Sequence, residues 1–344
     1  MGYIVVTIQE RDKWMSYVKK ALIYDFYHSW QYHSKIKVGE AFLFVYEEGD
    51  NSVIIPLVKR AIADSDFFDL TSAYGYVGPI ANVPIPEMGK AFLVRFKQAF
   101  LRYLKQEKIV CVFSRLHPII EQSRLLENIG GLYENGATVY IDLFATAEDQ
   151  KSHYRKSVKN SINALIAKNP EVREVKSDDD IKTFAMIYAE NMRRLNANEY
   201  YNFDEEYFRD LIGAEEFCSK PLILCLNNEA IAAGFFVYTN DIIEVHLLAT
   251  KTNYLHLSPT KLLIHEASVM GKSLGMKYLH LGGGVGGRED SLFFWKSGFS
   301  DKSFKFQTWR YISNRKAYDQ LAQQANGKNY QKDFFPSYRS LENS

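Results

Sequence analysis

In the first half of the chain, apolar runs alternate with turn-forming residues in an order that predicts a mixed sheet. The runs 41–46 and 53–62 flank the polar segment EEGDN, which is typical of a β-hairpin. A third strand is expected at 67–73, before a loop rich in glycine and proline. A closing strand is expected at 109–116. Between them, apolar residues at helical spacing predict a helix near 87–106, with a stripe made of Phe92, Phe96, Phe100 and Leu104.

The second half repeats this order of elements. Strands are expected at 222–227, 230–239 and 242–250, followed by a loop, a helix to about Gly275 and a strand at 277–283. We expect Ser258 to cap that helix and Pro259 to occupy its first position. Its buried face should include Leu262, Leu263 and Val269. Sequence identity between the halves is negligible, so the order of elements alone indicates a duplication.

Helical segments precede each copy, at 11–26 in the first half and at 181–195 and 204–213 in the second. Between the copies, a strand at 138–143 and a basic helix at 151–168 are expected. We therefore predict two domains, 1–145 and 146–344. The fold class is mixed α/β (α+β), with two tandem lobes that each hold a mixed, mostly antiparallel sheet flanked by helices.

Composition narrows the class of protein. With 47% hydrophobic residues, the chain has too much apolar surface to be disordered. The net charge of +1 argues against a DNA-binding protein, although a local basic groove stays open. Cys111, Cys218 and Cys225 show no zinc-ligand spacing, so we expect no metal. Without a signal peptide or a bilayer-length apolar run, we expect a cytoplasmic protein that could still touch a membrane surface.

The segment LGGGVGGREDSLFFWKSGFS is the first candidate for chemistry. Its glycines permit backbone amides to approach a ligand, and Arg288 could add donors. The alternative is a flexible connection. Lys296, between aromatic residues, is either a surface lysine or a cation placed to meet developing negative charge. The predicted cofactor-binding residues of this segment are Gly282, Gly283, Gly284, Gly286, Gly287 and Arg288.

The strand 242–248 is the second candidate. Strict alternation puts Ile243, Val245 and Leu247 on one face, and Glu244, His246 and Leu248 on the other with Ile242. Either Glu244 or His246 could accept a proton from an amine, so both are candidate catalytic residues with Lys296. The alternative is a solvated face or a satisfied ion pair.

Aromatic and basic segments supply candidate substrate contacts. Tyr74 and Tyr76 stand between glycines in AYGYVGP, as in a ring-stacking platform, or else fill a core. The segment DFYHSWQY mixes polar groups with aromatics and contributes Tyr27 and His28, unless it only caps a helix. The basic helix 151–168, with Arg155, is either a solvated face or a contact for a phosphate-bearing partner. Tyr254, in the loop after strand 242–250, completes the set.

Several phrases together resemble one bacterial family. They are DFYHSWQY, TSAYGYVGPI, FSRLHPII, HYRKSVKNSINA and the glycine-rich segment, spread over about residues 20–310. They are similar to the FemAB-like branch of the GNAT superfamily of N-acyltransferases. The resemblance implies two GNAT-like lobes, 1–145 and 146–344, with the acceptor held between them. It also implies a lysine that helps to stabilise the reaction centre, which Lys296 in the phrase WKSGF matches with Trp in place of the first Phe.

The resemblance implies an enzyme that transfers an acyl or aminoacyl group to an amine of a cell-envelope precursor. The acceptor would be a surface-polysaccharide amino sugar or a peptidoglycan peptide, carried on a nucleotide sugar or a lipid-linked glycan. No tightly bound cofactor is implied, and the donor is acyl-CoA or an aminoacyl-tRNA. Where CoA-dependent relatives have a glycine-containing pyrophosphate loop, residues 251–259 contain no glycine. The alternative is a non-catalytic module that binds nucleotide sugars or glycan precursors.

Overall fold

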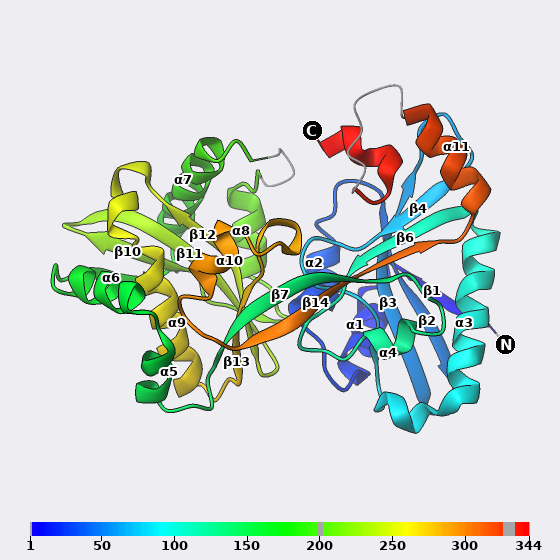
Figure 1. The fold of residues 1–344 in the computed structure, drawn as a ribbon, viewed down its shortest axis with the longest axis horizontal. Helices are drawn as coiled ribbons and strands as arrows, with labels where there is room; N and C mark the ends of the chain where they lie inside the picture. The colour runs from blue at the N-terminus through cyan, green and yellow to red at the C-terminus, as the bar shows by residue number, and fades with distance from the viewer. Residues whose placement is uncertain (1, 198–201, 326–333, 344) are drawn as a thin grey trace. The chain divides into compact units, whose positions relative to one another are not determined.

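A computed structural model describes residues 2–197, 202–325 and 334–343 (Figure 1). The chain folds into two compact units. The first unit comprises Met1–Asn135 and Phe306–Ser344, and the second comprises Gly136–Lys305. The chain passes from one unit to the other within β7 (Leu132–Asp142) and within β14 (Ser303–Ile312).

The sheet of the first unit runs in the order β1, β2, β3, β4, β6, β14, and the short β5 also pairs with β3. Its strands are β1 (Ile4–Thr7), β2 (Glu40–Glu48), β3 (Asn51–Ala61), β4 (Phe68–Thr71), β5 (Ile80–Ala81) and β6 (Ile109–Arg115). Its helices are α1 (Arg11–Lys20), α2 (Trp30–His33), α3 (Gly89–Gln106), α4 (Ser123–Leu126) and α11 (Arg315–Ala325), with 3-10 turns η1 (Phe26–His28), η2 (Ile85–Met88) and η6 (Ser337–Asn343).

Period-two alternation in this unit separates two cores. Along β2, Phe42 and Phe44 face α3, whereas Leu43 and Val45 face α1. The predicted stripe of α3 is buried in the first of these cores. Each large apolar side chain removed from water contributes about 1.5–3 kcal/mol, so both faces of the sheet stabilise the unit.

The sheet of the second unit runs in the order β7, β13, β12, β11, β10, β8, and the short β9 also pairs with β11. Its strands after β7 are β8 (Glu171–Glu174), β9 (Cys218–Ser219), β10 (Leu222–Leu226), β11 (Glu229–Thr239), β12 (Ile242–Thr250) and β13 (Tyr278–Gly282). Its helices are α5 (Ala147–His153), α6 (Lys156–Ile166), α7 (Asp178–Arg194), α8 (Glu205–Ile212), α9 (Thr260–Ser273) and α10 (Ser291–Lys296), with 3-10 turns η4 (Thr252–Leu257) and η5 (Val285–Gly287).

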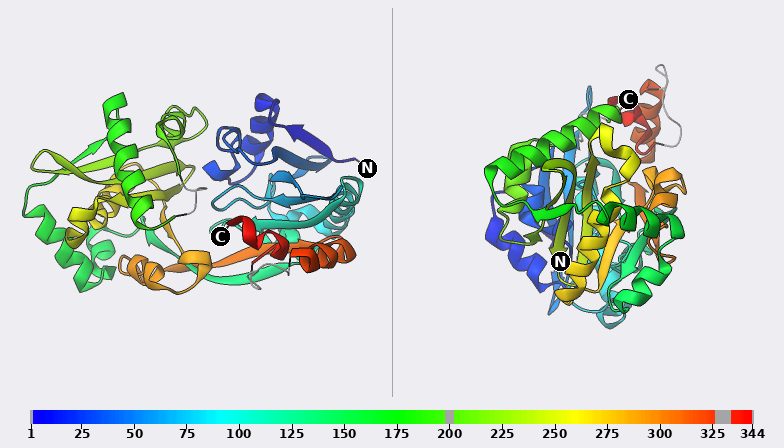
Figure 2. Two further views of the ribbon diagram at one scale, coloured as in Figure 1. Left: turned by 90° about the horizontal axis from the view of Figure 1, so that it is seen from above. Right: turned by 90° about the vertical axis from the view of Figure 1, so that its left-hand side faces the viewer.

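Helices cover both faces of this second sheet (Figure 2). α9 packs on one face with α6 beside it, and buries Leu262 and Leu263 against Phe236 and Ile243. α7 packs on the other face, where the rings of Phe184 and Phe235 lie 5.8 Å apart.

The two sheets share one pattern of strand pairing. In the first unit β2–β3 and β3–β4 are antiparallel, and β4–β6 is parallel across α3. In the second unit β10–β11 and β11–β12 are antiparallel, and β12–β13 is parallel across α9. The predicted fold class, with the same order of elements in both halves, is therefore confirmed.

Four details differ from the sequence-based expectations. Ser258 does not cap α9: it adopts the left-handed conformation at the end of η4, with φ of 50°, and Pro259 precedes the helix. Val269 is exposed, because it lies on the side of α9 away from the sheet. The expected helix 151–168 breaks at Tyr154 and Arg155, whose extended backbone separates α5 from α6. The expected helix 11–26 ends at Lys20.

The compact units also differ from the predicted lobes in one respect. Residues 306–344 pack with the first unit rather than with residues 146–305. The reason is strand pairing, because β14 pairs with β6 through residues 308–312 and α11 follows against β6.

Among the helices that the structure describes, none is long and apolar enough to cross a membrane.

Candidate active site

Two neighbouring strands bring Glu244, predicted to be catalytic, next to a histidine. β12 and β13 pair in parallel only between Ile242–Glu244 and Tyr278–His280. Nδ1 of His280 lies 2.7 and 2.9 Å from the two carboxylate oxygens of Glu244, and both side chains are buried. A carboxylate bound to this nitrogen orients the imidazole and stabilises its protonated form. The pair can therefore take up a proton as a unit.

β12 carries a bulge directly after Glu244. Val245 pairs with Phe236 of β11, but Leu247 pairs with Phe235, so β12 holds one additional residue there. A bulge interrupts the alternation of faces. Leu248 accordingly packs in the core beneath α9, and its predicted position on the face of Glu244 is wrong.

His246, the other predicted base on this strand, is held by α8. Its Nε2 lies 2.8 Å from the hydroxyl of Tyr207. Burial lowers the pKa of His246 to about 3, against the opposing effect of the Glu244 charge. His246 is therefore neutral at physiological pH and a weaker base than an ordinary histidine.

Lys296 ends α10 and belongs to the same site as Glu244. Its Nζ donates a hydrogen bond to the carbonyl of Gly283 at 2.7 Å. Burial lowers the pKa of Lys296 to about 8, while the negative charges of Glu244 and Asp290 oppose this shift. The ammonium is therefore mostly charged at pH 7, and it titrates far closer to neutrality than an exposed lysine.

The glycine-rich segment folds into a tight loop that glycine alone fits. Gly282, Gly286 and Gly287 have positive φ values of 75°, 65° and 82°. At Gly284 a Cβ would lie 2.0 Å from the carbonyl oxygen of Arg288, so no side chain fits there. The glycines thus permit the turn that holds Gly283 above Lys296.

Several groups of this loop already bond within it. The amide of Val285 donates to Oδ2 of Asp290 at 2.9 Å, and the amide of Gly287 donates to the carbonyl of Gly284. Arg288 is exposed, and its Nε donates to the carbonyl of Val285. Asp290 also caps α10 by accepting from the amide of Phe293. These bonds give the loop a fixed shape around Lys296.

Arg155, predicted to contact substrate, is bound to the last turn of α10. Its guanidinium donates to the carbonyl of Phe294 at 3.0 Å and to the hydroxyl of Ser297 at 2.9 Å. Its backbone amide donates to the carbonyl of Gly298 at 2.8 Å. A cation at a helix C-terminus is also electrostatically favourable. Arg155 therefore fixes the end of the helix that carries Lys296.

The four candidate substrate contacts of the first half lie together in the first unit. The ring of Tyr76 lies 6.1 Å from that of Tyr27, and the hydroxyl of Tyr32 donates to the carbonyl of Tyr74. His28 is fully buried, with Nε2 2.9 Å from the carbonyl of Val77. Burial lowers its pKa to about 3.

Tyr254 lies in η4, at the predicted place of the donor's phosphate loop. Its hydroxyl donates to a carboxylate oxygen of Glu229 at 2.5 Å, and Nζ of Lys251 lies 3.0 Å from the other oxygen. The amide of Thr252 donates to Glu190 at 2.7 Å. A 3-10 turn held by two acidic side chains therefore replaces a glycine loop.

Sequence analysis missed His280 and Asp290 as members of the site. His280 lies two residues before the glycine run on a predicted strand, and this position was the available signal. Its contact with Glu244 depends on the parallel register of two strands separated by α9, which composition does not reveal. Asp290 follows the glycine run directly and matches the N-cap preference for aspartate.

Comparison with known proteins agrees with this geometry. The family model described as "Acetyltransferase (GNAT) domain" matches residues 152–297, which include Glu244, His280 and Lys296. This part of the chain is a GNAT acyltransferase domain. The match confirms the predicted class of enzyme, an acyltransferase. No curated protein sequence matched the chain.

Solved structures support the same fold over nearly the whole chain. FemX shares 11% sequence identity, with a TM-score of 0.69 over 93% of this chain and 99% of its own. L-PGS from Bacillus licheniformis shares 12% identity, with a TM-score of 0.58 over 88% and 92% of the two chains. The C-terminal domain of a protein named as a lysylphosphatidylglycerol synthetase from Agrobacterium fabrum shares 11%, with a TM-score of 0.57 over 93% and 95%. With the GNAT match, these neighbours confirm the FemAB-like resemblance.

Proposed function

We propose that this GNAT domain transfers an acyl or aminoacyl group to the amine of a cell-envelope precursor. The observation that carries the proposal is one cluster: the Glu244–His280 pair, with Lys296 held at the glycine loop under the influence of Glu244. It combines a proton acceptor with a cation, which are the two groups that aminolysis of an activated ester requires.

The proposed reaction is a direct attack of the acceptor amine on the carbonyl carbon of a thioester or ester. The new C–N bond forms as the Glu244–His280 pair takes the proton from the nitrogen. The oxyanion that develops is stabilised by the ammonium of Lys296. The intermediate then collapses, the bond to the leaving sulfur or oxygen breaks, and the leaving group takes up a proton.

Electrostatic stabilisation falls mainly to Lys296 in this proposal. The amides of Val285 and Gly287 were candidates for an oxyanion hole, but both donate within the loop. Arg155 holds α10 and acts on the reaction through the position of Lys296. Tyr74 and Tyr76 stay candidate contacts for the acceptor.

The class of acceptor rests on the fold neighbours. The name of one of them denotes synthesis of lysylphosphatidylglycerol, an aminoacylated lipid, and FemX shares the fold over most of both chains. These names favour an aminoacyl or acyl group passed to a cell-envelope amine, either an amino sugar of a surface polysaccharide or a peptide of peptidoglycan. Acyl-CoA and aminoacyl-tRNA are the two donor classes to assay.

Replacement of Lys296 tests the proposal. With acyl-CoA and charged-tRNA donors assayed against amino-sugar and peptide acceptors, we expect Lys296→Met to lower turnover by about 100-fold or more, the usual cost of losing one preorganised group at an oxyanion. Lys277→Met is the matched control, because Lys277 forms an exposed ion pair with Asp241 in the same unit. Equal turnover in both variants would exclude the role of Lys296. Precursor binding that survives in both, without turnover in the wild type, would instead identify a binding module.

A further inference from the structure

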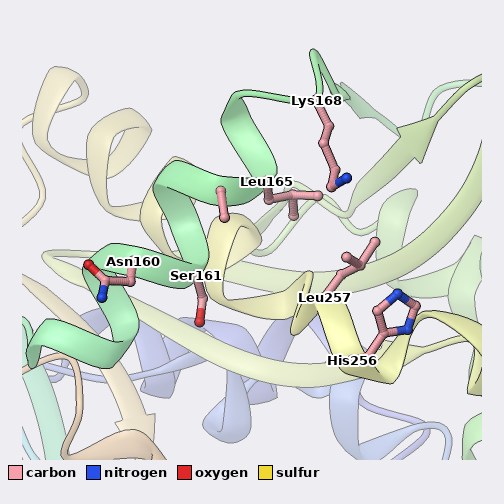
Figure 3. Close-up of a pocket in the computed structure, with 7 residues that line it drawn as sticks. Asn160, Ser161, Leu165, Lys168, His256 and Leu257 are labelled. Carbon is pink, nitrogen blue, oxygen red and sulfur yellow. The ribbon is translucent and has the colours of Figure 1, made fainter.

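A separate pocket lies between α6 and η4 in the second unit (Figure 3). Its volume is about 300 Å³, at the lower end of the range for small-molecule sites. α6 supplies one side of it and η4 the other, with Lys168 and His256 on opposite sides. The residues that line it are Asn160, Ser161, Ala164, Leu165, Lys168, His256 and Leu257.

The polar groups of this pocket favour an anion. Lys168 contributes an ammonium, His256 an imidazole, and Ser161 and Asn160 a hydroxyl and an amide, whereas no carboxylate lines the pocket. Ser161 extends this set, because its hydroxyl accepts a hydrogen bond from Nζ of Lys261 at 3.0 Å. Two lysines and a histidine therefore gather at one small cavity.

These cations lack an acidic counterpart. Within residues 2–197, 202–325 and 334–343, no ion pair involves Lys168, His256 or Lys261. Burial alone lowers the pKa of Lys261, with no neighbouring carboxylate to oppose the shift. Positive charge left without a partner in a concave site attracts an anionic ligand.

We propose that this pocket binds the phosphate group of a small organic ligand. Phosphate oxygens accept several hydrogen bonds at once, as the ammonium, imidazole and hydroxyl groups here require. Leu165 and Leu257 offer an apolar wall to the organic part of the same molecule. The acyl donor is the ligand that we assign to the site, and this assignment of its source rests on the proposed function. The phosphate chemistry itself rests on the pocket alone.

Equilibrium binding tests the site without any need for turnover. Calorimetric titration with pyrophosphate and with CoA would compare the wild type with the double variant Lys168→Gln/Lys261→Gln. We expect affinity to fall about tenfold or more, as for the loss of charge-assisted hydrogen bonds. The matched control is Lys156→Gln/Lys159→Gln, which removes the same charge from positions of α6 that do not line the pocket. We expect the control to change affinity less than twofold.

A second variant separates shape from charge. Ala164→Leu fills the pocket without altering any charge, and we expect it to weaken binding while circular dichroism shows an unchanged fold. Displacement of CoA by pyrophosphate would support the acyl donor as the source of the phosphate. Independent binding of the two would support the phosphate site with a different organic phosphate as its ligand. Absence of pyrophosphate binding at millimolar concentration, or equal affinity in the pocket and control variants, would overturn the proposal. Because turnover at Lys296 is a separate readout, failure here leaves the proposed function standing.

Discussion

The two units each contain a glycine-bearing loop that a side chain from elsewhere holds in place, but the two holding groups differ in charge. In the first unit, the carbonyl of Val77 lies 2.9 Å from Nε2 of His28 and accepts from Gln122 at 2.5 Å. Burial lowers the pKa of His28 to about 3, so both groups are neutral at physiological pH. In the second unit, the ammonium of Lys296 holds the carbonyl of Gly283.

Asp290 adds a second charge to the loop of the second unit. The backbone amides of Phe293 and Val285 donate to its carboxylate and lower its pKa. The first loop is therefore built from neutral hydrogen bonds that pH does not alter near neutrality. The second is held by ionised groups, one of which titrates near pH 8. The difference teaches that a loop of similar composition serves packing in one unit and is suited to charge stabilisation in the other.

Removal of the carboxylate beside the second loop should have the largest effect. Glu244→Gln keeps an oxygen that can accept from His280 but removes the negative charge, so the pair no longer takes up a proton as before. We expect turnover to fall by about 10²–10⁴-fold, the usual contribution of a general base. Steady-state kinetics measures the effect, and the midpoint of thermal unfolding serves as the check on folding. Turnover within threefold of the wild type would assign the proton transfer to another group.

Disturbance of the first loop should instead lower stability. Gly75 has φ of 91°, and a Cβ there would lie 2.1 Å from the ring of Tyr27. We expect Gly75→Ala to lower the free energy of unfolding by about 2–4 kcal/mol, from backbone strain and overpacking together.

Gly49→Ala is the matched control for this change. Gly49 also has a positive φ, of 59°, but no atom lies within 4 Å of its Cβ position. Strain alone should cost about 1–2 kcal/mol there. Urea unfolding compares the two variants, and equal losses would show that the contact with Tyr27 contributes nothing.

A smaller effect is expected where α10 is fixed from outside the loop. Arg155→Met removes the hydrogen bonds from the guanidinium to Phe294 and Ser297, so the helix that carries Lys296 loses its anchor. We expect kcat to fall about tenfold with little change in KM, because small displacements of a catalytic group reduce rates. Arg193→Met, at an exposed position of α7, is the control. A raised KM for the acceptor with unchanged kcat would return Arg155 to substrate binding.

Much of the fold was predictable because strands announce themselves locally. The alternation of Phe42 to Val45 between two cores is written into the order of residues, and so are the turns that end each strand. The repeated order of elements followed from these strands alone. The predictions that were wrong involve geometry that arises between segments: the bulge opposite Phe235 that moves Leu248, and the extended backbone at Arg155 that splits one basic helix into two.

The site was predictable in part for the same reason. Lys296 and Glu244 stand out as charged residues within apolar surroundings. His280 and the anchor role of Arg155 depend on contacts across 36 and 139 residues of sequence. Such contacts are set by strand register and helix packing, and no local pattern encodes them.

The pH dependence of turnover tests the role of Lys296 most directly. Since its pKa is lowered to about 8, the charged form is complete below that pH and is lost as the pH rises through it. A cation that stabilises an oxyanion therefore predicts a rate that falls above pH 8, and a fall that Lys296→Arg moves to higher pH because guanidinium stays protonated. A rate that instead rises through pH 8 and loses this rise in the Arg variant would make Lys296 a base and contradict the account.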